Sequence, residues 1–366
     1  MFTHTLAIAA ASLGWAAAYA IPSSDGFPDP SAQQLLSIET QADGLLSNAP
    51  PPPALSQAGM TNFQLIAFNE NFEVAFFSSL IDNITNHVDG FEYLSDHRTE
   101  GEILEILRTV KAQEELHALT AITTLQHFNA SLVPQPCTYQ FPTSNLEDAI
   151  DLAATFTALV LGTLQDAEQS FARNGDDGPV RAVSSVIGQE GEQNGFYRFI
   201  LNRKPSEKPF LTTSTAAFAF SALQQFVVSC PFDVAAIPIP IFPTLAVETK
   251  AEARDMNLTF SVDLSGSPYG PDSDLGGMFV TYLVGQQVPF SEPITNAEWQ
   301  GTVLTFDAEF PFTANIMDGL SIAALTNSAG PFADADAVVN STVAAPGLIQ
   351  VNVPITAHGE DQGMRL

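Results

Sequence analysis

Basic residues are scarce in this chain. Its 366 residues include 12 Lys and Arg against 41 Asp and Glu, so the formal net charge at pH 7 is −29. Proteins that bind nucleic acid, or an anionic membrane surface, need clustered Lys and Arg to meet the phosphates. The composition therefore predicts neither of these partners. It is typical of a soluble, acidic exterior that attracts cations.

Long apolar runs are also missing. The longest is Leu6–Ala18, which is too short to span a bilayer and is followed by Ala18-Tyr19-Ala20, a small-x-small cleavage pattern. We therefore expect residues 1–20 to be a secretory signal peptide and the protein to be extracellular. The amino-terminal part of this segment lacks Lys and Arg, which departs from the usual pattern, so a membrane-anchored segment is the alternative.

Cysteine is the third scarcity, since only Cys137 and Cys230 are present. In an oxidising compartment two such residues are expected to form one disulfide. A catalytic thiol is the alternative, but no activating His is visible beside either one. Four Asn-x-Ser/Thr sequons are compatible with glycosylation of a secreted chain: Asn83, Asn129, Asn257 and Asn340.

Periodicity divides the rest of the chain into a helical and a β-rich part. Residues 21–60 form a polar, Pro-rich segment, and its proline run Ala49-Pro50-Pro51-Pro52-Pro53 predicts a stiff linker. A helical period predicts four helices, over 61–85, 99–128, 145–173 and 178–201, and a fifth, buried one over 212–228. Together these occupy a domain of residues 61–230.

Composition changes at Pro231. The Pro-rich stretch 231–243 predicts an extended connector. In residues 244–366 the period becomes two, which predicts short strands over 257–262, 277–284, 302–310, 321–327 and 347–353. We expect an α+β protein in which a four-helix bundle with an extra buried helix precedes a small antiparallel β-domain, arranged as a sandwich.

One carboxylate and one imidazole interrupt an apolar helix face. Glu114 and His117 lie on the stripe that includes Leu107, Val110 and Ala121. An ionised carboxylate in such a place is costly unless it is paired or bound to a metal. A buried Glu–His hydrogen-bonded pair is the simpler explanation, and metal ligation is the alternative.

Two further helices each carry a lone inward acid, Glu70 and Glu190. Glu73 shares its helix face with Asn69, so it is a weaker inward candidate than Glu70. Counting from the predicted helix ends places Glu70 and Glu114 at the same height in an antiparallel pair. A Glu on one helix and Glu-x-x-His on another are the ligands of carboxylate-bridged metal sites in four-helix bundles.

Two segments resemble a known family. Gly188-Gln189-Glu190-Gly191-Glu192-Gln193-Asn194-Gly195-Phe196-Tyr197-Arg198 and Ser206-Glu207-Lys208-Pro209-Phe210-Leu211-Thr212-Thr213 resemble secreted fungal ferritin-like proteins associated with stress response and late sexual development. The connector from Ile237 to Pro243 is similar to theirs, and the resemblance spans roughly residues 60–366. It implies a ferritin-like bundle, secretion and a family whose biochemical activity is poorly defined.

The resemblance also assigns candidate metal ligands. Glu70 matches the first-helix ligand, Glu114 and His117 the second-helix motif, and Glu190 the fourth-helix Glu. Gln193 stands where the family's second His is expected, and Gln is a poorer ligand for iron or zinc.

The third helix has no acid near the expected level, residues 159–162. Asp166 and Glu168 lie at least a turn away on a face that is expected to be solvated. The remaining ligands suffice for a single iron, manganese or zinc ion, or for none.

Two functional hypotheses follow. The preferred one is a secreted scaffold with a structural or binding role, for which cell-wall or other extracellular components are candidate partners, and with at most one metal ion. The other is a metal-dependent oxidoreductase. Full dimetal chemistry would need ligands that the chain lacks, and no other catalytic motif is present.

Overall fold

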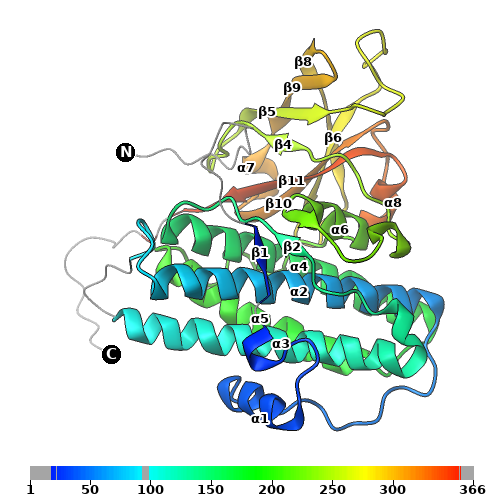
Figure 1. Cartoon of the computed structure of the whole chain (residues 1–366). Coiled ribbons are helices and arrows are strands. Elements are labelled where there is room, and N and C mark those ends of the chain that lie inside the picture. The colour runs from blue at the N-terminus through cyan, green and yellow to red at the C-terminus, as the bar shows by residue number, and fades with distance from the viewer. Residues whose placement is uncertain (1–17, 22, 93–98, 354, 356–366) are drawn as a thin grey trace.

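The structure is a computed structural model that describes residues 18–21, 23–92, 99–353 and 355 (Figure 1). Most of the predicted signal segment, residues 1–17, lies outside the described residues, as do residues 356–366 of the predicted β-domain. The described part combines helices with antiparallel sheets and so confirms the α+β class.

Four long helices lie side by side in the helical part (Figure 1): α2 (Gln57–Thr85), α3 (Glu100–Asn129), α4 (Leu146–Asn174) and α5 (Val180–Ile200). Side chains of Ser56, Thr99 and Asn145 accept hydrogen bonds from the first turns of α2, α3 and α4. Such caps fix where a helix begins. The Ser56 cap explains why α2 begins at Gln57 rather than near residue 61.

Aromatic rings fill one end of this helical part. Phe72 and Phe76 of α2 pack edge-to-face on Phe156 of α4, with ring centroids 5.2 and 5.0 Å apart. Phe77, the next residue of α2, stacks with Tyr197 of α5 at 6.0 Å. These contacts bury large apolar areas in one cluster and set α2, α4 and α5 in register.

The polar segment over 21–60 contains an unpredicted helix, α1 (Ala32–Gln41). Ser31 and Gln34 form a capping box at its start, a signal that the sequence does contain. Ile38 and Ala42 pack against Ala112 on the outer side of α3. This helix was therefore missed, whereas the proline run over 49–53 contains no helix or strand, as predicted.

The fifth predicted helix is shorter than expected. Helix α6 (Ala216–Gln224) begins after the Thr215 cap, and the chain then becomes strand β3 (Val227–Ser229). Strand β3 pairs with β2 (Thr138–Tyr139), which also pairs with β1 (Tyr19–Ala20). The predicted disulfide between Cys137 and Cys230 is confirmed beside this sheet. Burial of α6 is as predicted.

Two four-stranded antiparallel sheets form the β-rich part. One has the order β11-β10-β6-β7 and the other β4-β5-β9-β8. Their strands are β4 (Ala246–Val247), β5 (Met256–Asp263), β6 (Phe279–Val284), β7 (Phe290–Pro293), β8 (Thr295–Gln300), β9 (Val303–Phe310), β10 (Gly319–Thr326) and β11 (Thr342–Val351). Inward residues of both sheets share one apolar core, as in a sandwich.

Short elements complete the chain: 3-10 turns η1 (Ser23–Asp25), η2 (Ala130–Leu132) and η3 (Val234–Ala236), and helices α7 (Phe312–Asn315) and α8 (Ala335–Val339). The turn η3 interrupts the connector that was expected to be extended throughout. Of the four sequon residues, Asn129, Asn257 and Asn340 are exposed and Asn83 is half-buried.

The two parts pack directly on one another. Strand β10 is buried along its whole length, because its outer face meets the helices. Leu320 and Ile322 of this face join one apolar cluster with Leu159 of α4 and Phe218 of α6. The sheet β11-β10-β6-β7 therefore has a helical layer on one side and the second sheet on the other.

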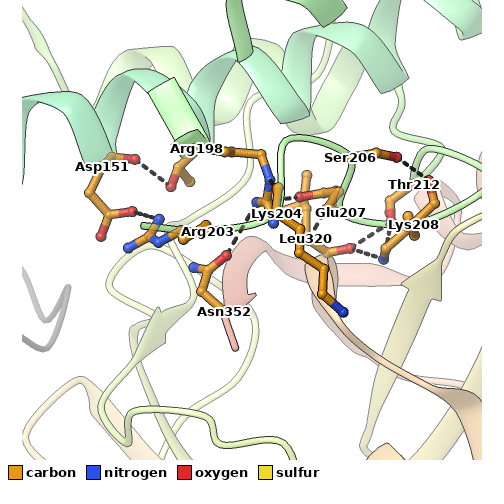
Figure 2. Close-up of polar contacts among 11 residues, drawn as sticks. Asp151, Arg198, Arg203, Lys204, Ser206, Glu207, Lys208, Thr212, Leu320 and Asn352 are labelled. Carbon is orange, nitrogen blue, oxygen red and sulfur yellow. Dashed lines mark hydrogen bonds and ion pairs between the residues drawn. The ribbon is translucent and has the colours of Figure 1, made fainter. Parts of the chain in front are cut away.

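A buried polar network crosses the same junction (Figure 2). The Arg198 guanidinium at the end of α5 donates to Glu207 at 3.0 Å and to Asn352 at 3.2 Å. Glu207 also accepts from the backbone N–H of Leu320, whose carbonyl accepts from Lys208 at 2.6 Å. Glu207 and Lys208 thus join α5 to β10.

Replacing Glu207 by Leu should destabilise the protein by roughly 3–5 kcal/mol, because Arg198 would keep its charge in a buried place without a partner. Denaturant unfolding followed by circular dichroism measures this loss. The exposed pair between Arg254 and Glu252 is the matched control, and Glu252→Leu should leave the unfolding midpoint unchanged. Equal midpoint shifts in both variants would contradict the assigned role of Glu207.

Asp166 lies at this junction rather than on the solvated face that was expected. Its carboxylate accepts from the backbone N–H of Ala216, at the start of α6. Burial, followed by the charge of Asp336, raises the pKa of Asp166 from 3.8 to about 7, and Arg173 opposes this shift. The carboxylates of Asp166 and Asp336 meet because α4 and α8 are brought together by the β-rich part.

The folded protein therefore binds the Asp166 proton more tightly than the unfolded chain does. This contribution to stability is complete below pH 4 and is lost as the pH rises through about 7. We expect the fall in thermal midpoint between pH 5 and pH 8 to be smaller in Asp166→Asn than in the wild type, and calorimetry at the two values measures it. An identical fall in both proteins would show that Asp166 does not titrate as described.

Candidate metal centre

Four side chains from three helices converge inside the helical part. Glu70 comes from α2, Glu114 and His117 from α3, and Glu190 from α5, and one ligand atom of each lies within 4.8 Å of all the others. Among the described residues this is the one group of three or more His, Cys, Asp or Glu side chains placed closely enough to share an ion. The sequence had singled out all four.

Imidazole Nδ1 of His117 is the centre of the group. It lies 2.9 Å from Glu114 Oε2 and 3.8 Å from both Glu70 Oε2 and Glu190 Oε1. Donor atoms at roughly 2.0–2.2 Å from one ion lie about 3–4 Å from each other. The three separations from His117 Nδ1 are therefore compatible with a shared ion.

The carboxylates are shielded from solvent and poorly satisfied. Glu114 and Glu190 are fully buried and Glu70 is 1% exposed. Within the described part of the chain, both oxygens of Glu70, both of Glu190 and Oε1 of Glu114 have no hydrogen-bond partner. An unpaired buried polar group costs about 1–3 kcal/mol, and a charged one costs more. Such a cluster is costly unless protons or a cation compensate it.

Electrostatics give the same result. Burial is the main cause that raises the pKa of Glu70 and of Glu190 well above the usual value, and the neighbouring carboxylates raise both further. Desolvation and mutual repulsion both disfavour the charged forms. Both groups therefore bind a proton, or a cation, more readily than an exposed Glu does.

Glu73 is a fourth acid at the same place. It is fully buried, and its Oε1 accepts from Asn69 at 2.9 Å, while its Oε2 has no partner among the described residues. Burial and then the charge of Glu114 raise its pKa. Glu73 points inward as fully as Glu70 because Asn69 also turns inward and bonds to it, but of the two only Glu70 belongs to the ligand group, so the lower rank of Glu73 as a ligand stands.

Tyr197 of α5 lies next to the acids of the site. Its ring is fully buried, and its hydroxyl has no partner among the described residues. The pKa of this hydroxyl is raised by burial and then by Glu114, Glu73 and Glu190, so these acids lie nearby. A buried phenol usually finds a partner, and its absence here adds to the unsatisfied polar atoms.

The two departures from the family pattern are visible in the structure. No acid of α4 joins the group, and Leu159 packs instead toward α6 and β10. Gln193 lies on α5 beside the site, but its amide Nε2 donates to Gln113 Oε1 at 3.1 Å. Gln193 Oε1 is buried without a partner in the described residues, so it remains a candidate ligand oxygen.

The donor set fits one divalent ion. Three carboxylates and one imidazole suit iron or manganese as well as zinc. With a bound ion these residues would hold it in a water-poor interior, and the ion would supply the positive charge that the acids lack.

Comparison with known proteins finds no family model and no curated protein that matches this chain. The assignment of a function therefore depends on the residues and on the geometry.

Glu190→Gln keeps the shape of the side chain and removes one buried acid. We expect the metal-free variant to be as stable as the metal-free wild type or more stable, because one costly group is gone. Excess Zn²⁺ or Mn²⁺ should raise the melting temperature of the wild type and not of the variant. A variant that is clearly less stable without metal would show that Glu190 has a structural partner.

Proposed function

We propose that this protein is a secreted, ferritin-like metal-binding protein that holds one divalent ion inside its helical bundle. Glu70, Glu114, His117 and Glu190 are the ligands. The role is structural or binding rather than catalytic, in keeping with the resemblance to proteins of stress response and sexual development.

The convergence of four donor atoms within 4.8 Å carries this proposal. The competing explanation, a buried Glu–His pair, accounts for the 2.9 Å hydrogen bond between His117 and Glu114. It does not account for Glu70 and Glu190, whose oxygens have no partner in the described residues. A cation satisfies all four side chains at once.

Several further features are compatible with secretion. The disulfide between Cys137 and Cys230 is of a kind that persists in oxidising compartments. In the described part of the chain, no helix combines the length and the apolar character that crossing a membrane requires. The net charge of −29 would concentrate cations near the surface.

A metal-dependent oxidoreductase is the second candidate. Glu73 and Tyr197 favour it, because they add an acid and a phenol next to the ligand group. Both could accept or donate a proton there. The identity of the metal separates the two, since a redox role needs iron or manganese and a structural role does not.

Elemental analysis of the natively purified full chain tests the proposal. We expect about one divalent ion per chain, which is lost in Glu114→Ala. Glu298→Ala, which removes an exposed acid of β8, is the matched control and should retain the ion. Metal-free wild-type protein that also fails to bind added Mn²⁺, Fe²⁺ or Zn²⁺ would refute the proposal.

A further inference from the structure

Only one of the four proposed ligands reaches toward solvent. The His117 side chain is 14% exposed, whereas those of Glu70, Glu114 and Glu190 are at most 1% exposed. His117 follows Glu114 by one turn, on the side of α3 that faces α5. An ion that approaches from solvent therefore meets the site from this side.

The other sides of the site are closed by packing. Phe77 and Tyr197 stack on each other, and Tyr197 lies next to the acids. Helix α4 is covered by α6 and by β10, through the cluster that contains Leu159 and Phe218. Apolar side chains of α2 and α3 fill the space between those two helices.

Three glutamines connect α3 with α5, beside an apolar cluster that the two helices share through Leu119 and Val183. Gln189 and Gln193 of α5 each donate an amide hydrogen to Oε1 of Gln113 on α3, at 2.8 and 3.1 Å. Gln113 in turn donates to the carbonyl of Ala42, just after α1, at 3.4 Å. We call Gln113, Gln189 and Gln193 the glutamine seam. Each of its members is next to a proposed ligand or one turn from it.

Two side-chain oxygens of the glutamine seam have no hydrogen-bond partner in the described part of the chain. Because both α5 amides turn their nitrogens toward Gln113, their oxygens face elsewhere. Oε1 of Gln189 and Oε1 of Gln193 are buried and have no hydrogen-bond partner among the described residues. Amide oxygens are good ligands for hard divalent cations and can replace water in their shell.

We propose that the glutamine seam is the route by which a divalent cation reaches the proposed metal centre. The ion exchanges part of its water for the Gln189 and Gln193 oxygens and is then bound by His117 and the three carboxylates. This inference depends on the proposed function. It assigns to Gln189 a role in the rate of binding, while the carboxylates and His117 set the affinity.

Stopped-flow binding of Co²⁺ to the metal-free full chain, followed by visible absorption, tests the route. Loss of one amide contact should make Gln189→Leu bind about five- to tenfold more slowly. Release into a chelator should slow by the same factor, so the dissociation constant stays the same. Gln189→Glu should bind faster than the wild type, because it adds a negative charge to the route.

Gln126, an exposed glutamine nearer the end of α3, supplies the matched controls. Gln126→Leu should leave the association rate unchanged, and Gln126→Glu measures the effect of one added charge far from the seam. Because Gln189 is half-buried, both of its variants should fold, which circular dichroism checks. If Gln189→Leu does not fold, the acceleration in Gln189→Glu beyond that in Gln126→Glu carries the test.

The outcomes separate the two proposals. Binding of Co²⁺ that depends on Glu114 but has the same rate in all glutamine variants would overturn the route and leave the metal centre intact. A changed dissociation constant with an unchanged association rate in Gln189→Leu would make Gln189 a ligand and also overturn the route. A wild type that binds no Co²⁺ would overturn both.

Discussion

Carboxylates cannot remain ionised in a dry interior without compensation, and this constraint governs the helical part. Glu70, Glu73, Glu114 and Glu190 are all buried, and His117 is the one imidazole bonded among them. The free-energy cost of burying several carboxylates is offset by bound protons, by a cation or by both. A fold that keeps these buried acids is less stable than one with apolar residues at the same positions. Such a loss of stability is typical of functional sites.

The surroundings of the acids make the cost high. Aromatic rings of α2, α4 and α5 close one end, and the β-rich part covers α4. Both exclude water and so lower the local dielectric, which strengthens every interaction between charges. The same exclusion makes a bound cation more effective than it would be at the surface. Packing far from the acids therefore determines how strongly they bind.

Much of the site was predictable because a lone acid on an apolar helix stripe is a strong signal. Glu114 and Glu190 were found in this way, and helix heights brought Glu70 level with Glu114. The burial of Glu73 was undervalued because periodicity gives an angle on the helix and cannot tell which neighbours cover that angle. Asn69 and Glu73 turn inward together, and only the packing of the neighbouring helices shows it.

The fold shows the same division between local and distant causes. Long helices and strands followed from their periods, and α1 was missed although Ser31 and Gln34 mark its start. The position of Asp166 could not be predicted, because its partners Ala216 and Asp336 are brought to it by contacts between the two parts of the chain. The spacing of residues along the sequence does not predict that Asp166 contacts Ala216 and Asp336.

Strand β10 has a consequence for how this chain can be divided. Both faces of β10 are buried. The face of its sheet that meets the helices is therefore apolar and not suited to contact with water. A fragment that contained only the helical part or only the β-rich part would expose a large apolar surface and would tend to aggregate. The two halves are thus one cooperative unit, and gene rearrangements that exchange either half on its own would be selected against.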